Sequence, residues 1–418
     1  MILLKNATYI HPETFEITIG HMLVDEAPGA GFQFVPADTK ADKTIDCHGL
    51  LVTQAFINAH HHVYSALSRG MNAPKKSPTN FTETLEYIWW TLDQCLDQDM
   101  VRLSALTTAM NCAKHGCTFA IDHHASPNFL KGSLETIAKA FDEVGVGHLL
   151  CYEITDRYGI EKTRESLEES DEYLNSRRGL VGLHASFTVE EDTLLKSVAI
   201  ADKHKTGIHI HVAEDPMDEK FTKEKYGCSV VQRLERAGAL SLKNNIFGHG
   251  IHMDIKERTL VRESGTWMAV NFDSNLNNRV GFFTSTELGD RIMLGTDGMH
   301  SDMIKSAQTA LFAGQNFDNV SWIDIYTRLR NGARYLYESN IPHGSNNLVI
   351  LDYDSPTPVT QNNFLGHFYF GLEGRHVKHT IADGKLIYSE GKILTADEDS
   401  ILKESRKAAQ MLWNKMSE

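Results

Sequence analysis

The alternation of apolar and polar residues divides the chain into three zones. Residues 1–50 contain short segments with a period of two, separated by Gly and Pro, which is typical of antiparallel strands. From residue 51 to about 340, short apolar runs alternate with amphipathic stretches that mostly end at or near Gly, as helices commonly do. Strand-like segments return at 346–354, 366–374 and 377–394, and a charged helix is expected from about Asp397.

The middle zone contains eight apolar runs of strand length. One precedes His60, and the others lie at 118–122, 148–154, 181–187, 207–214, 244–250, 266–272 and 291–297. Strands alternating with helices in this number predict an α/β fold built on a (β/α)8 TIM barrel. Because neither strand-rich end has a complete core, we expect the two ends to form one small composite β-sandwich. The predicted domains are the sandwich at 1–50 plus 344–394, the barrel at 51–343 and a C-terminal helix at 395–418.

Composition narrows the class of protein. The 418 residues are 41% hydrophobic, enough for a substantial core, and no apolar run reaches the roughly 18 residues of a membrane span. The formal net charge is −14 without a run of five basic residues, which argues against nucleic acid and membrane surfaces as partners. Six scattered cysteines and no signal peptide predict a cytoplasmic protein with reduced thiols. We expect a small-molecule substrate, and a homo-oligomer stays open.

Metal-binding side chains stand at or just past the ends of several apolar runs. The set consists of His60, His62, His211 with Glu214, His249 and Asp297. Imidazole and carboxylate ligands together suit a divalent transition metal such as zinc or iron. A site assembled from the ends of several strands is typical of a catalytic barrel, so the pattern predicts an enzyme.

The segment NAHHH supplies two candidate ligands. His60 and His62 are two residues apart, and in a strand such residues project from the same face, so both rings can reach one ion. His61 points to the opposite face and is expected to be structural.

The segment HIHVAED supplies a ligand and a proton carrier. His209 and His211 share a face; we assign His211 as the ligand and His209 to packing inside the barrel. Glu214, just beyond the strand, is placed to shuttle protons. His249 in FGHGIH and Asp297 in LGTDG complete the set. A lone His or Asp at the end of a strand is usually an ordinary turn residue. His249 and Asp297 count as candidate site residues because they occur together with the others, in the order of the strands.

In this order, the motifs resemble the amidohydrolase superfamily, and more narrowly its deaminase and chlorohydrolase branch. FINAHHH, LGTDG and DSNLNN stand where that branch has its strand-1, strand-8 and strand-7 motifs, and VGLHASFTV places His184 at a substrate-contacting strand-4 histidine. The segment from SPNFLKG to EITDRYG is most similar to SsnA-type aminohydrolases. The resemblance covers nearly the whole chain, and its motifs specify the fold and metal site better than the substrate.

The resemblance implies one divalent metal, zinc with iron as the alternative, held by His60, His62, His211 and Asp297. No lysine stands at the end of strand 4, where dinuclear members carry one, so a mononuclear site is expected. A second metal recruited by His123 and His124 is the alternative.

The expected reaction is hydrolytic deamination of a small nitrogen heterocycle or amidine-like compound, at a C–N bond that is not a peptide bond. In the implied mechanism the metal activates water, Asp297 accepts its proton and His249 hydrogen-bonds the attacking oxygen. Glu214 protonates the adjacent ring or amidine nitrogen and then helps deliver a proton to the departing ammonia. The same residues suit hydrolysis of a C–Cl or amide bond. A non-catalytic metal-binding protein that retains the fold is the other alternative, although no ligand or Glu214 is lost.

Substrate contacts are expected from His184 and from the loop after strand 1. Trp89 or Trp90 would stack on a flat ring, and Arg69, Glu83 and Glu86 are further candidates. The competing interpretation is that the two tryptophans pack within the helix that follows this loop.

Overall fold

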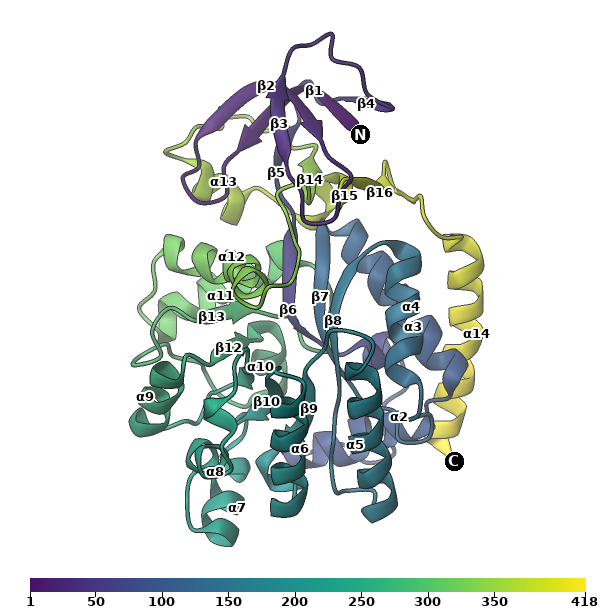
Figure 1. Cartoon of the computed structure of the whole chain (residues 1–418), viewed down its shortest axis with the longest axis vertical. Helices are drawn as coiled ribbons and strands as arrows, with labels where there is room; N and C mark the ends of the chain where they lie inside the picture. Colours follow the sequence, from purple (N-terminus) through teal and green to yellow (C-terminus); the bar gives the residue numbers. More distant parts are fainter.

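The two ends of the chain meet in one mixed β-sheet in the computed structural model, which describes residues 1–418 (Figure 1). Its strands are β1 (Ile2–Ile10), β2 (Ile17–Val24), β3 (Phe32–Val35), β4 (Lys43–Asp46), β5 (Leu51–Gln54), β14 (Leu348–Leu351), β15 (Val377–Ala382), β16 (Lys385–Ser389) and β17 (Lys392–Ile393). Their order is β17-β16-β15-β14-β5-β1-β2-β3, and β4 pairs with β1. The antiparallel pair of β14 and β5 joins the two ends. The ends thus associate as predicted, and the sandwich stays a prediction.

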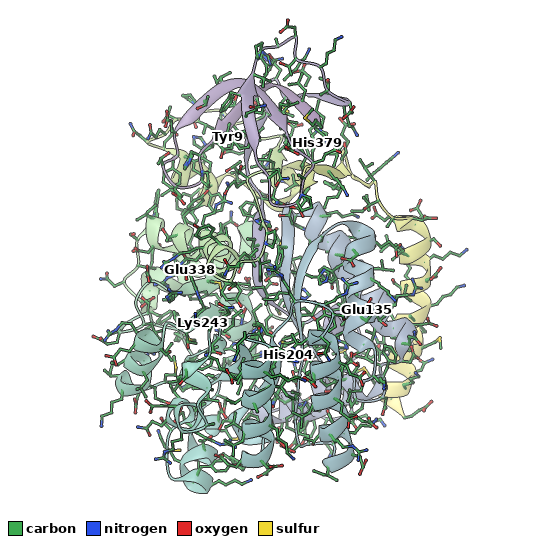
Figure 2. The ribbon with its side chains drawn as sticks, viewed as in Figure 1. Tyr9, Glu135, His204, Lys243, Glu338 and His379 are labelled. Carbon is green, nitrogen blue, oxygen red and sulfur yellow. The ribbon has the colours of Figure 1, made fainter.

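This terminal sheet has its own small core. Alternate residues of its strands share one face, and Leu4, Val52, Leu348, Ile350 and Ile381 pack together there. Two residues labelled in Figure 2, Tyr9 on β1 and His379 on β15, lie in the same sheet. The sheet therefore forms a layer beside the rest of the chain.

Eight parallel strands make up the central part of the molecule. They are β6 (Phe56–His61), β7 (Cys117–His124), β8 (Gly147–Tyr152), β9 (Val181–Ala185), β10 (Ile208–Val212), β11 (Ile246–His249), β12 (Trp267–Val270) and β13 (Ile292–Leu294). Regular pairing divides them into a three-stranded sheet β6-β7-β8 and a five-stranded sheet β9 to β13. Single parallel bridges connect the two sheets, Ile154 with Leu183 on one side and His61 with Asp297 on the other. The α/β class and the eight parallel strands agree with the prediction.

Helices follow the parallel strands and cover their outer side (Figure 1). The α-helices are α1 (Phe81–Thr84), α2 (Trp90–Cys95), α3 (Gln98–Lys114), α4 (Ser133–Val144), α5 (Ile160–Leu174), α6 (Glu191–Lys203), α7 (Pro216–Tyr226), α8 (Val230–Arg236), α9 (Ile255–Ser264), α10 (Phe272–Asn278), α11 (Met303–Phe317), α12 (Trp322–Glu338), α13 (Phe364–Phe370) and α14 (Glu398–Ser417). The shorter helical segments are η1 (Val63–Ser68), the π-helix η2 (Leu85–Trp89), η3 (Ser186–Thr188), η4 (Ala239–Ser241) and η5 (Gly374–His376). None of these helices combines the length and apolar character that crossing a bilayer requires.

Helix α14 closes one side of the molecule. It runs alongside α3 (Figure 1), where Arg102 on α3 donates to Glu404 at 3.0 Å. The indole N–H of Trp413 donates to the carbonyl of Leu67 at 2.9 Å. The C-terminal helix thus secures the segment that follows β6.

Two predicted strands differ from the structure. The run before His60 is two strands, because the Ala55 amide donates to the carbonyl of Asn347 beside β14, whereas the next amide, Phe56, donates to the carbonyl of Gly116 directly before β7. The chain thus passes from the terminal sheet to the parallel sheet between Ala55 and Phe56. The predicted strand at 366–374 was wrong, since most of it belongs to helix α13. Phe364 and Phe368, four residues apart, lie on one helical face and pack against Tyr326 on α12.

Candidate metal and active site

The four predicted ligands converge at the carboxyl ends of three parallel strands. His60 belongs to β6 with His62 directly after it, His211 belongs to β10, and Asp297 follows β13. His62 Nε2 is 3.2 Å from His211 Nε2 and 3.0 Å from Asp297 Oδ1. His60 Nε2 is 3.9 Å from the same Asp297 oxygen. The structure therefore brings these donors together, from strands far apart in sequence.

Backbone carbonyls select the nitrogen that each ring presents to the site. His62 Nδ1 lies 2.6 Å from the carbonyl oxygen of His123, and His211 Nδ1 lies 3.0 Å from that of His184. An N–H must occupy each Nδ1 to make these bonds, so Nε2 is the nitrogen that each ring turns toward the site, and in the neutral ring it carries the lone pair. Fixing the tautomer in this way orients a histidine as a metal ligand.

His60 provides the observation that tests whether a metal fits. Its Nδ1 is 2.8 Å from His209 Nε2, while its own Nε2 is buried and has no hydrogen-bond partner. Burial lowers the pKa of His60, His209 and His211 well below the ordinary histidine value, and the neighbouring histidines lower it further. Neutral rings with inward lone pairs beside a carboxylate suit a divalent cation. His209 is therefore buried as predicted, but it also orients His60.

The other histidines of these motifs have different partners. His61 Nδ1 lies 3.6 Å from Asp122 Oδ1, in keeping with a structural role. His123 Nε2 donates to the carbonyls of Leu183 and His209, at 3.1 and 3.2 Å, so this nitrogen carries a hydrogen and does not face a metal with a lone pair. His124 Nε2 lies 2.8 Å from the Ser126 hydroxyl.

Two carboxyl groups whose pKa values shift in opposite directions face His249, the last residue of β11. His249 Nε2 is 3.6 Å from Glu214 Oε2 and 3.9 Å from Asp297 Oδ2, while its Nδ1 donates to Asn275 Oδ1 at 2.8 Å. Burial, followed by the nearby Asp297, raises the pKa of Glu214 well above its ordinary value. Burial also opposes ionisation of Asp297, but the hydrogen bond with His62 and the charge of that ring hold its pKa well below the usual range. Such a pair separates proton donor from proton acceptor.

The backbone around the site is strained. Ala213, His249 and Asp297 have φ of +47°, +68° and +54°, in the left-handed region that non-glycine residues rarely adopt. The Asp218 carboxylate accepts the Ala213 amide at 3.0 Å and the Phe187 amide at 3.1 Å, joining the segments after β10 and β9. Such strain persists only where surrounding bonds maintain it, and it concentrates at functional sites.

A cavity opens onto this cluster. The predicted substrate contacts His184 and Trp89 both line it. Most of its apolar wall comes from the segment after β6, which supplies Tyr64, Phe81, Leu85, Trp89 and Trp90, and Met299 after β13 adds to it. The further candidates Arg69, Glu83 and Glu86 lie outside its lining. Ser274 of the strand-7 motif also lines the cavity, from α10 rather than from a strand.

One functional candidate, Glu153, is absent from the sequence-based set. It follows β8, lines the cavity and is 3% exposed. Arg157 Nη2 donates to its Oε1 at 2.9 Å, His123 Nδ1 is 3.3 Å from its Oε2, and His184 Nε2 is 4.0 Å from its Oε1. Burial raises the pKa of Glu153, but interactions with His184, His123 and Arg157 outweigh it and lower the pKa. The available signal was an acidic residue at the end of the apolar run HLLCYEI.

Comparisons with known proteins agree with this arrangement. The chain is 28% identical over 385 residues to a 5'-deoxyadenosine deaminase of Methanopyrus kandleri, a match that covers 87% of this chain and 86% of that protein. An adenosine deaminase from Xanthomonas campestris with bound zinc has a TM-score of 0.81 at 17% identity, covering 98% of both chains. Atrazine chlorohydrolase TrzN from Arthrobacter aurescens TC1, complexed with zinc, has a TM-score of 0.83 at 15% identity, covering 98% of this chain and 100% of that chain.

These two solved structures share the fold of this protein. The sequence profile described as "Amidohydrolase family" matches residues 51–387, which contain every ligand candidate and Glu214. The chain therefore belongs to the amidohydrolase family.

Proposed function

We propose that this protein is a metal-dependent hydrolytic deaminase that releases ammonia from a small, flat nitrogen compound. One observation carries the proposal. Glu214, whose pKa is raised, and Asp297, whose pKa is lowered, both face His249 beside a cluster of histidines that could bind a metal. Hydrolytic removal of an amino group requires a proton donor, a proton acceptor and a metal that activates water, and this arrangement can supply all three. The similarity to the 5'-deoxyadenosine deaminase favours an amino-substituted ring as the substrate.

We infer one divalent metal, zinc with iron as the alternative, held by His60, His62, His211 and Asp297. The orphaned Nε2 of His60 and the zinc bound in two proteins of the same fold support this inference. When bound, the metal lowers the pKa of water and supplies a nucleophile near neutral pH. The backbone carbonyls that bond Nδ1 of His62 and of His211 keep a hydrogen on Nδ1, which leaves Nε2 to bind the metal.

The residues of the chain then carry the protons. Asp297, ionised in the buried site, accepts a proton from the attacking water, and His249 steadies the attacking oxygen through Nε2. Glu214 holds a proton, since burial favours its neutral form, and transfers it to the nitrogen that departs. A C–O bond forms, the C–N bond breaks, and the products are a carbonyl compound and ammonia.

The cavity wall is proposed to hold the ring. Trp89 offers an aromatic face, and His184, whose Nδ1 lies 2.7 Å from Thr188 Oγ1, offers its Nε2 to the substrate. Burial, followed by the charge of Arg157, lowers the pKa of His184 to about 3, so the ring is neutral. His184 can then read a donor or an acceptor on the substrate according to its tautomer.

We also infer that the two parallel sheets are parts of one (β/α)8 barrel at residues 51–343. The bridges on both sides, and the solved structures of similar fold, support closure. The composite sandwich at 1–50 plus 344–394 and the C-terminal helix at 395–418 complete the proposed domains. Because strand β5 pairs in the terminal sheet, we propose that residues 51–54 are part of that sheet and that the barrel begins after Ala55.

The test is an assay of purified protein of measured metal content against purines, pterins and triazines. Ammonia and chloride are measured together, because the same site suits removal of chloride. We expect ammonia release, and Glu214→Gln should lower kcat by about 10²–10⁴-fold with metal content unchanged. Glu235→Gln, at an exposed position on α8, is the matched control. Full turnover by the Glu214 variant would contradict its assignment, and chloride without ammonia would replace the deaminase by a chlorohydrolase.

A further inference from the structure

The cavity lining contains acidic side chains but no lysine or arginine. Three carboxyl groups line it, those of Glu153, Glu214 and Asp297. Glu214 and Asp297 belong to the proposed proton transfer and metal set. Glu153 has no role in either, although a buried carboxylate is costly unless it is paired.

Arg157 holds Glu153 from behind the cavity wall. Its guanidinium group donates to Glu153 Oε1 at 2.9 Å and lies 4.5 Å from the ring centre of Trp90, a wall residue. Arg157 itself is outside the lining. The ion pair therefore fixes the Glu153 carboxylate in place, while the Arg157 guanidinium group stays outside the cavity.

The position of Glu153 relates it to the reacting end of the substrate. Ligand atoms of Glu153, His184 and His211 lie within 4.8 Å of one another. His211 is a proposed metal ligand, so a substrate group that reaches Glu153 is attached close to the carbon under attack. An ionised carboxylate only accepts hydrogen bonds, and the group it binds must donate.

We propose that Glu153 is a specificity-determining residue that binds an N–H donor of the substrate beside the reacting carbon. The site would accept neutral or cationic rings whose reacting carbon neighbours a ring N–H or a second amino group. It would reject analogues that carry a carboxylate or phosphate at this end. This inference rests on the proposed deaminase function and deepens it.

The same three donors also allow a different interpretation, in which Glu153 and His184 bind a second metal ion. The nearby Arg157 opposes this interpretation, since its cationic group already occupies one oxygen of Glu153. Metal content separates the two. A ligand role predicts that Glu153→Gln lowers the number of metals per chain, whereas a substrate-binding role leaves it unchanged.

The experiment compares matched substrate pairs on metal-loaded protein. Each pair consists of a ring with the N–H donor and its N-methylated analogue, with a phosphate-bearing analogue as a third member. For the wild type we expect N-methylation to lower kcat/KM by about 10²-fold or more, because a methyl group replaces the N–H that Glu153 would accept and cannot donate to the buried carboxylate. In Glu153→Gln this ratio should fall below about tenfold.

Two further variants separate recognition from folding. Asp93→Asn removes the other carboxylate near Arg157, at 3.7 Å, but Asp93 is outside the cavity lining, so the wild-type ratio should persist. Glu153→Asp keeps the charge and should keep most of the discrimination. Equal ratios in wild type and Glu153→Gln, or equal loss in Asp93→Asn, would overturn the inference.

Calorimetric binding of the same pairs keeps the two proposals distinguishable. If no ring is deaminated, the proposed function fails, and the Glu153 inference is judged on binding alone. We expect tighter binding of the N–H member by the wild type and loss of that preference in Glu153→Gln. Turnover without any preference would refute the inference and leave the deaminase proposal standing, as would equally good use of the phosphate-bearing analogue.

Discussion

Replacing Asp93 by asparagine should change how thermal stability depends on pH. Asp93 on α2 is 2% exposed, both its oxygens accept from the Tyr158 hydroxyl at 2.8 and 2.9 Å, and its Oδ2 is 3.7 Å from Arg157. The same guanidinium group bonds Glu153. Burial raises the pKa of Asp93, Arg157 lowers it and Glu153 raises it, to about 7 in total. One cation between two buried carboxylates leaves one of them protonated up to neutral pH.

The sign of the effect follows from proton linkage. The pKa rises from 3.8 to about 7 on folding, so the folded protein retains a proton that the unfolded chain releases. This contribution to stability is fully present below pH 3.8 and is lost as the pH rises through about 7. The rise corresponds to at most about 4 kcal/mol. For a chain of 418 residues that amounts to about 4–5 °C in Tm.

The assay is differential scanning calorimetry of the wild type and Asp93→Asn, both metal-loaded, at several pH values between 5 and 8. Asparagine does not titrate, so Tm of the variant minus Tm of the wild type should rise with pH by about 3 °C, because only the pH units between 5 and about 7 fall inside the range from 3.8 to about 7. At pH 5 the variant should be the less stable, because its amide N–H2 faces Arg157. Asp99→Asn, at an exposed position on α3, is the control and should give a flat difference. A difference for Asp93→Asn that is constant within one degree would refute the reasoning.

Two other substitutions test contacts that support the site. His209→Ala removes the partner of His60 Nδ1 and should weaken zinc binding by about 10–100-fold in a chelator competition, whereas unchanged affinity would show that His209 only fills space. Arg233→Met removes the buried donors to the carbonyls of Ser186 and Val189, at 2.7 and 2.8 Å, and should cost about 2–4 kcal/mol. Its Tm should fall by about 2–5 °C, and an unaltered Tm would contradict the assigned bonds.

Periodicity predicted the elements whose partners are local. The helices of the middle zone were recognisable because apolar positions recur at helical spacing and most of these helices stop at or near Gly. The same reasoning failed at α13, where the aromatic run of 366–370 resembles a strand. Aromatic residues favour strands in general, and only contact of Phe364 and Phe368 with Tyr326 of α12 decides for the helix here.

The sequence by itself determined which side chains stand at the strand ends, because a period of two and the order of the runs are properties of the chain. His60, His62, His211, His249 and Asp297 were found in this way. The tertiary structure alone decided what each of them contacts. His60 and His209 are 149 residues apart, and Glu153 in the cavity lining is bonded by Arg157, which also contacts the wall residue Trp90. Tautomers, carboxyl protonation and substrate contacts depend on such neighbours, since burial and hydrogen bonding set them and local sequence does not.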